Sequence, residues 1–165
     1  MKETRFLIKL LKEGRIEFVE PSEEIGESYI NKSESYLESS RILIKNNKRE
    51  EAVSMAYYSM YQIVIALLYK TGIKSENHTA SMIILKEVYG IDNEEIMKAK
   101  KERIDKQYYV DFKITNEEVR EMIKQAKGFY NIIYAFIDRM NNQEIKNYRN
   151  KLRNLLNIKW VKEDK

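Results

Sequence analysis

The pattern of apolar and polar residues predicts that one helix forms the centre of the fold. The stretch from Glu51 to Thr71 carries apolar side chains around most of its helical circumference. A helix of this kind packs in the middle of a bundle, because it must be covered on several sides. Ser54, Ser59 and Gln62 interrupt the stretch. We therefore expect it to be too short and too polar for a membrane span, which needs about twenty consecutive apolar residues.

A line of polar residues runs along the same stretch, at Ser54, Tyr58, Gln62 and Tyr69. Steps of four and seven residues place such side chains near one line on a helix. The line is either a slightly polar seam whose hydroxyls find partners in the core, or the floor of a groove. On the second interpretation, Tyr58 is a candidate substrate-binding residue.

Apolar periodicity predicts further helices around the central one, so the expected fold is an all-α, antiparallel up-and-down bundle. We expect about four to five main helices, a basic helix at the C-terminal end and a short arm at the N-terminal end. Ser22 and Thr115 are expected to cap two of the helices, and Gly72 to end the central one. The other predicted helices span residues 22–46, 79–89, 92–109 and 115–140, and a last one reaches about Trp160.

The first 21 residues are expected to form an arm that lies against the bundle. Residues Phe6–Leu11 favour a short helix or an extended segment, and Arg15–Glu20 alternates in polarity like a β-strand. We find no partner for this strand in the rest of the sequence and expect it to remain unpaired. The predicted organisation is an arm over 1–21, a bundle over 22–140 and a basic amphipathic helix over 141–165.

Length and composition indicate one helix-rich domain. A chain of 165 residues buries roughly two-thirds of its unfolded surface. The absence of cysteine excludes disulfides and thiolate metal sites and fits a reducing, cytoplasmic environment. A single histidine and scattered carboxylates give no metal-ligand spacing, and no glycine-rich phosphate loop is present. No metal, cofactor or membrane association is therefore expected.

Positive charge is concentrated at the end of the chain. The net charge is +4, and the segment from Arg139 to Lys165 carries eight Lys or Arg against three Asp or Glu. Such an asymmetry is compatible with a polyanionic partner, although most charged helix faces are only solvated.

A second cationic segment lies on the helix predicted to end near residue 109. Arg103 and Gln107 share a face of that helix, and Lys100 lies one turn earlier. Arginine binds phosphate through two parallel hydrogen bonds, and tyrosine offers a hydroxyl or a stacking ring. The alternative is an ordinary solvated helix. The candidate phosphate-binding residues here are Lys100, Arg103, Lys106, Gln107, Tyr108 and Tyr109.

His78 is the only histidine, and therefore the only side chain whose ordinary pKa lies near neutrality. It lies where a loop enters a helix, between Asn77 and Thr79. It is either a capping or surface residue, or an acid–base group. No signature of a serine or cysteine nucleophile accompanies it.

The order of these features resembles a known family. A segment AYYSMY at Ala56–Tyr61 is followed by LLYKTG at Leu67–Gly72, NHT at Asn77–Thr79 and ERIDKQY at Glu102–Tyr108. Together they resemble the HEPN domain, a helical family named for nucleotide binding, over about Leu11–Ile137. The resemblance implies a homodimer whose active site is shared between the two copies. It also implies a nucleotide or RNA as ligand and a minimal nucleotidyltransferase as the antitoxin partner of a toxin-type protein.

The catalytic motif of the HEPN family is an arginine followed, after about four to six residues, by a histidine. Arg103 matches the arginine, but Gln107, Tyr108 or Tyr109 stands in the place of the histidine. RNA cleavage without a metal ion needs a group that transfers protons near neutral pH, and a tyrosine with a pKa of about 10 does this poorly. His78 resembles a histidine that precedes the third helix in one subgroup. The resemblance thus implies Arg103, Tyr108 and His78 as catalytic candidates.

Two functions from different classes follow from these features. The first is a nucleotide- or RNA-phosphate-binding protein of the HEPN type that acts as a metal-independent endoribonuclease. The second is a noncatalytic dimeric interaction module, whose basic C-terminal helix docks an acidic protein or a nucleic acid.

Overall fold

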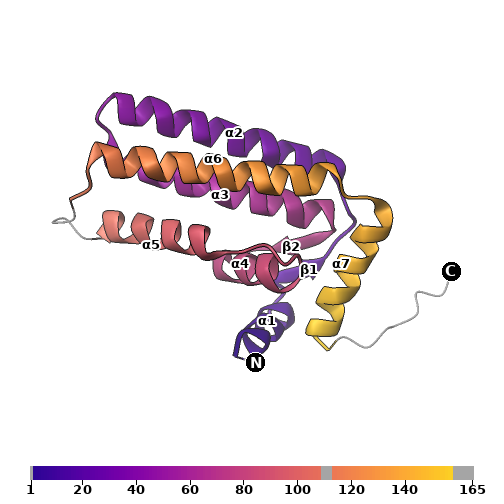
Figure 1. Cartoon of the computed structure of the whole chain (residues 1–165). Coiled ribbons are helices and arrows are strands. Elements are labelled where there is room, and N and C mark those ends of the chain that lie inside the picture. The colour runs from indigo at the N-terminus through magenta and orange to yellow at the C-terminus, as the bar shows by residue number, and fades with distance from the viewer. Residues whose placement is uncertain (1, 109–112, 158–165) are drawn as a thin grey trace.

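The computed structural model describes residues 2–108 and 113–157, with side chains in the first range described up to residue 105. Over these residues the chain forms seven helices and one two-stranded sheet (Figure 1). In the main bundle, helices α3 (Arg49–Lys70) and α6 (Asn116–Asp138) run in one direction. Helices α2 (Glu23–Lys45) and α5 (Glu94–Tyr108) run in the other. The predicted all-α bundle is confirmed.

Helix α3 is the centre of the bundle, as its apolar circumference predicts. It contacts α2, α4 (His78–Glu87), α5 and α6, and nearly all of its side chains between Ala52 and Leu68 are buried. The prediction that it is too short and too polar to span a membrane was wrong on length and composition, since both suffice. However, 78% of its apolar window is buried inside the bundle. Packing against the other helices therefore accounts for its apolar residues.

Small residues allow α2 to approach α3 closely. A Cβ atom at Gly26 would lie 3.4 Å from the carbonyl oxygen of Ala66. Deeper in the contact, the hydroxyl of Ser33 donates to the carbonyl of Ser59 at 2.7 Å, and the hydroxyl of Ser59 donates to the carbonyl of Ser33 at 2.9 Å. Both serines are fully buried. Their hydroxyls therefore find partners across the helix pair, as buried polar groups require.

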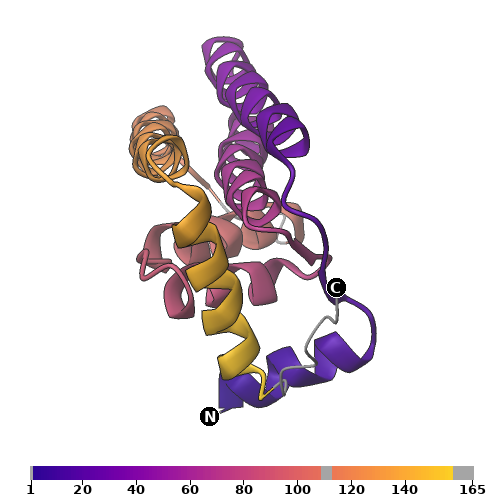
Figure 2. The ribbon, with the colours of Figure 1, turned by 90° about the vertical axis from the view of Figure 1, so that its right-hand side faces the viewer.

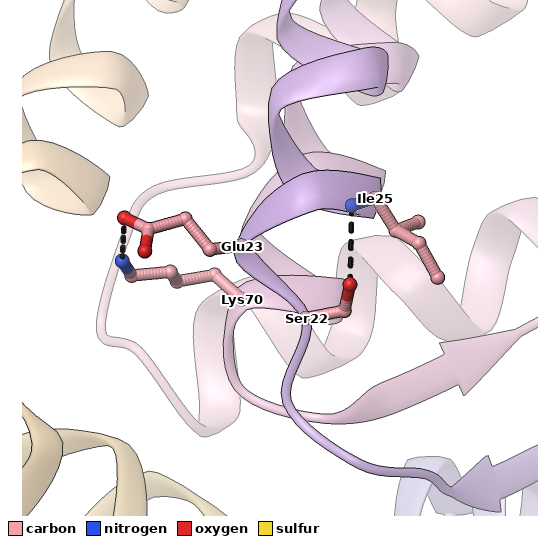
Figure 3. A network of polar contacts seen from close by, with 4 residues as sticks. All are labelled: Ser22, Glu23, Ile25 and Lys70. Atoms are coloured by element: carbon pink, nitrogen blue, oxygen red, sulfur yellow. Dashed lines mark hydrogen bonds and ion pairs between the residues drawn. The ribbon is translucent and has the colours of Figure 1, made fainter.

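The beginning of α2 is tied to the end of α3 (Figure 3). The hydroxyl of Ser22 accepts a hydrogen bond from the backbone N–H of Ile25 at 3.1 Å, which confirms the predicted cap. Next to it, the ammonium group of Lys70 lies 3.1 Å from the carboxylate of Glu23. Gly72 ends α3 with a positive φ of 72°, as predicted.

The N-terminal segment packs on the rest of the chain, and its strand is paired, which corrects the prediction of an unpaired strand. Helix α1 (Lys2–Lys12) buries Leu7 and Leu10. Strand β1 (Ile16–Phe18) pairs in antiparallel fashion with β2 (Ile73–Ser75), directly after α3. Alternation of polarity could not identify β2, because a strand of three residues is too short to show a period.

Helix α7 (Asn142–Leu155) crosses the ends of the bundle helices and approaches α1 (Figures 1 and 2). It ends before Trp160, the predicted end, which lies outside the described residues. Ile145 and Leu152 are buried against the rest of the chain. The basic C-terminal helix therefore packs on its own bundle.

Candidate functional site

Arg103 of α5 lies against two consecutive tyrosines of α3. Its Nη1 atom donates a hydrogen bond to the hydroxyl of Tyr58 at 3.1 Å. The guanidinium carbon lies 5.2 Å from the centre of the Tyr57 ring and 5.4 Å from the centre of the Tyr58 ring. Consecutive side chains of a helix point about 100° apart. The two rings approach the guanidinium group from different directions, and at these distances both can attract it through their faces.

His78 is the first residue of α4 and contacts two tyrosines of α3, Tyr57 and Tyr61. Its Nδ1 atom lies 2.7 Å from the hydroxyl of Tyr57. Its ring stacks on Tyr61, with 3.8 Å between centres and 23° between planes. The cap of α4 is Asn77, whose side chain accepts from the N–H of Ala80 at 2.9 Å. The capping interpretation of His78 was therefore wrong.

Lys100 joins α5 to the start of α4. Its ammonium group donates to the hydroxyl of Thr79 at 2.7 Å, and Thr79 directly follows His78 in the sequence. Lys100 is one helical turn before Arg103 and points toward the same region. Two cations of α5 and one imidazole of α4 thus meet at the tyrosines of α3.

The electrostatics of this group are those of a positive, partly dehydrated site. Burial lowers the pKa of His78 below its ordinary value of 6.5, and the charges of Arg103 and Lys100 lower it further. Burial and Arg103 likewise lower the pKa of Lys100. Burial raises the pKa of Tyr57 above 10, so its hydroxyl stays protonated at neutral pH. His78 is accordingly neutral at pH 7.

The neutral imidazole can accept a proton, and it becomes a proton donor only after it has done so. If Nδ1 of His78 carries the proton, it donates to the oxygen of Tyr57 and Nε2 is an acceptor; in the other tautomer the hydroxyl of Tyr57 donates to Nδ1. A histidine that is neutral near pH 7 and held by such a contact is suited to acid–base chemistry. Among the described residues, no group of three or more His, Asp or Glu side chains is placed to hold a metal ion.

Four of the predicted site residues come together here: Lys100, Arg103, His78 and Tyr58. Lys106, Gln107 and Tyr108 belong to the last turn of α5, but their side chains are outside the described part of the structure. Tyr109 lies outside it entirely.

Sequence reasoning missed three residues of the site. Tyr57 was assigned to the apolar stripe of the core helix, Tyr61 was given no role, and Thr79 was predicted only as the start of a helix. The spacing of Tyr57, Tyr58 and Tyr61, three hydroxyls within about one turn of a core helix, is the signal that could have revealed them. A phenol in a core normally requires a polar partner.

The predicted polar line on α3 is buried in its middle and partly exposed at two of its tyrosines. Tyr58 faces Arg103, and Tyr69 stacks on Tyr29 with 5.5 Å between ring centres. Gln62, between them, is buried, and its Oε1 atom has no hydrogen-bond partner in the described part of the chain. The line is thus a seam at Gln62 and a partly exposed surface at the two tyrosines.

The fold and the site define a helical bundle with a positive, tyrosine-lined centre. The family model of the HEPN domain matches residues 26–154, most of the chain and nearly all of α7. The chain therefore belongs to the HEPN domain family, a family of helical domains often with nucleotide- or RNA-related roles that commonly dimerise or pair with other proteins. It is similar to a UPF0332 protein of Thermotoga maritima. The two are 24% identical over 123 residues, which are 70% of this chain and 93% of that protein.

Proposed function

We propose that this protein binds the phosphate group of a nucleotide or of RNA at Arg103, Lys100 and Tyr58, and that it cleaves RNA there without a metal ion. The observation that carries the proposal is the common contact with Tyr57. Its ring lies under the guanidinium of Arg103, and its hydroxyl holds the imidazole of His78 at 2.7 Å. Phosphate-binding and proton-transferring groups are thus neighbours.

The charges of the site support the proposed phosphate binding. Arg103 lowers the pKa of Lys100 and of His78, so positive charges repel one another there. An anion placed between them relieves that repulsion. The attraction between the anion and the cations is stronger because the site is partly dehydrated. The planar guanidinium suits two oxygens of one phosphate, and Lys100 adds a point charge.

The proposed cleavage is an internal transfer at phosphorus. The 2′ oxygen of the RNA bonds to the adjacent phosphorus atom while the bond from phosphorus to the 5′ oxygen breaks. The products are a 2′,3′-cyclic phosphate and a 5′ hydroxyl. Neutral His78 takes the proton of the 2′ hydroxyl, and Arg103 stabilises the extra negative charge on the phosphate. We assign the proton taken up by the 5′ oxygen to Tyr108, on the family resemblance alone.

Membership of the HEPN family also leads us to propose two protein partners. One is a second copy of this chain, with the Arg103 sites near the contact between copies. The other is a minimal nucleotidyltransferase that acts as antitoxin. Sedimentation equilibrium tests the first proposal, and loss of RNA cleavage when purified nucleotidyltransferase is added tests the second.

Cleavage of single-stranded RNA in the presence of EDTA tests the activity. We expect cleavage by the wild type and by Arg41→Ala, which removes the same kind of side chain from an exposed position of α2. We expect none by Arg103→Ala or His78→Ala. Equal cleavage by wild type and Arg103→Ala would remove Arg103 from the mechanism. No cleavage by any of them, with nucleotide binding lost only in Arg103→Ala, would restrict the function to binding.

A further inference from the structure

Two pairs of tyrosine rings lie along α2 and α3, and the first of them is next to the Arg103 site. Tyr36 meets Tyr58 with 6.2 Å between ring centres and 57° between planes. Two turns away, Tyr29 stacks on Tyr69 at 5.5 Å and 7°. All four rings are partly exposed. We call these four tyrosines and Lys32 the tyrosine track.

Lys32 gives the track a positive charge. It is exposed and lies between the two tyrosines of α2, with its ammonium group 6.0 Å from the centre of the Tyr29 ring and 5.8 Å from that of Tyr36. At the other end, Tyr58 accepts the hydrogen bond from Arg103. One cation, Lys32, therefore lies between the two ring pairs, and another, Arg103, lies at the end that belongs to the site.

The acidic residues of α2 face elsewhere. On a helical wheel, Glu27, Glu34 and Glu38 lie about 160° from the centre of the face that carries the track. The structure agrees, because Glu34 accepts a hydrogen bond from Tyr130 of α6, and Glu27 lines a cavity between α2 and α6. The α2 side of the track thus lacks the carboxylates that would repel a polyanion.

We propose that the tyrosine track binds single-stranded RNA, with bases against its rings and the backbone along Lys32, next to the phosphate held at Arg103. This inference rests on the proposed phosphate site and names its ligand as a strand rather than a mononucleotide. Basic grooves with aromatic rings are the usual surface for unpaired nucleic acid, since every base can stack on a ring. The tilt between Tyr36 and Tyr58 lets a base lie on one ring without displacing the other.

The dimensions suit a short strand. Tyr29 and Tyr36 are two helical turns apart, about 10 Å along α2. That distance is roughly the length of three stacked nucleotides at about 3.4 Å each. A mononucleotide can reach the Arg103 site alone, whereas only a longer strand reaches Tyr36 and Lys32. Length dependence of binding therefore separates the track from the site.

Fluorescence anisotropy with 2′-O-methyl uridylates, which have no 2′ hydroxyl to react, tests the inference. The probes are a labelled 2′-O-methyluridine monophosphate and a labelled strand of about eight nucleotides. We expect Tyr36→Leu to weaken binding of the longer strand about tenfold and to leave binding of the mononucleotide unchanged. We expect Lys32→Gln to reduce the salt dependence of the longer strand by about one phosphate contact.

Matched controls lie on α6. Tyr134 is an exposed tyrosine with a stacked neighbour, and Lys124 is an exposed lysine. Tyr134→Leu and Lys124→Gln should bind both probes like the wild type. A loss as large as that of Tyr36→Leu and Lys32→Gln would show a general effect of charge or stability and would overturn the track.

Each remaining outcome decides between the two proposals. If Arg103→Ala loses both probes while Tyr36→Leu binds both normally, the track is overturned and the phosphate site stands. If the wild type binds neither probe, both proposals fail. Tyr36→Leu could also weaken self-association, measured by sedimentation equilibrium, and reduce binding of both probes to the same extent. In that case the track is a contact with a second copy of this chain, and the RNA assignment is overturned.

Discussion

The hydroxyl of Tyr57 lies 2.7 Å from Nδ1 of His78, and this contact joins the middle of the core helix to the first residue of α4. Tyr57 is fully buried, whereas His78 is partly exposed. The phenol therefore acts as a fixed internal support that orients an imidazole at the surface. Because the ring of Tyr57 also lies under Arg103, a change at this one residue should affect both groups.

The first prediction concerns the pKa of His78. It should lie below 6.5, because burial and the charges of Arg103 and Lys100 disfavour the protonated ring. Arg103→Gln should raise this pKa by removing one of the charges. As the chain has a single histidine, NMR titration of the imidazole signals measures it without ambiguity. A value at or above 6.5 in the wild type would contradict the proposed environment.

The second prediction is the effect of this shift on stability. The unfolded chain binds a proton at His78 at a higher pH than the folded chain does. Stability therefore rises with pH through this range and is lost as the pH falls below about 6.5. His78→Gln should remove that part of the loss. Urea unfolding of both proteins between pH 7 and pH 5 measures it; parallel pH profiles would show that His78 does not contribute.

The third prediction concerns Tyr57→Phe, which preserves the ring under Arg103 and removes the contact with His78. We expect a loss of about 1 to 2 kcal/mol in the free energy of unfolding, the usual cost of removing one partner of a buried hydrogen bond. RNA cleavage should fall more than RNA binding, since Arg103 keeps its aromatic support. Tyr89→Phe is the matched control, because Tyr89 is also a buried phenol hydrogen-bonded to a side chain, Thr71, but lies away from the site. Equal loss of cleavage in both variants would contradict a specific role for Tyr57.

Periodicity predicted the bundle because burial in a helix leaves a repeating apolar pattern. Helix α3, residues 49–70, is apolar around most of its circumference and lies in the centre of the bundle. Ser22 and Thr115 cap α2 and α6 as expected. The short strands could not be found in this way. Their pairing depends on Ile16 meeting Ser75 across almost sixty residues, and no local pattern records that contact.

The residues of the candidate site differ in the same way: some leave a recognisable pattern in the sequence and others do not. Arg103 and Lys100 were found because charged residues on a helix are conspicuous in a sequence. Tyr57 was taken as core because a buried tyrosine has the same spacing as a buried leucine. That His78 lies near Arg103 is a property of the packing of α4 and α5 on α3, which the sequence states nowhere.

The basic helix α7 shows why net charge alone did not reveal its role. Nη1 of Arg149 donates to three backbone carbonyls, those of Val19, Thr71 and Gly72, and its guanidinium lies 5.6 Å from the ring of Phe18. One of the basic residues counted toward a docking surface therefore supports the fold. Deleting residues 142–165 would expose the core that Leu152 covers. Exposed single residues, such as Lys151, are the better test of docking.

The fourth prediction compares two glycines with nearly equal backbone conformations. Gly72 and Gly14 have φ values of 72° and 70°. A Cβ at Gly72 would collide with Arg149 and with the carbonyl of Val19, whereas one at Gly14 would meet nothing within 4 Å. We expect Gly14→Ala to cost about 1 to 2 kcal/mol from the left-handed conformation alone. Gly72→Ala should cost at least about 2 kcal/mol more, measured by urea unfolding. Equal costs would mean that the surroundings of Gly72 adjust freely.

The last prediction concerns Arg149 itself. Arg149→Met keeps an apolar stem against Phe18 but leaves the carbonyls of Val19, Thr71 and Gly72 without this donor, so we expect a loss of about 3 kcal/mol in the free energy of unfolding. Lys151→Met, which removes an exposed positive charge from the same helix, should change it by less than about 0.5 kcal/mol. The two variants lower the net charge equally. A difference in their stability would therefore be due to the backbone contacts of Arg149. An equal loss of RNA affinity in both would be due to the lost charge. Should Arg149→Met be as stable as the wild type, α7 is held by its apolar residues alone, and its arginine is then available for a partner.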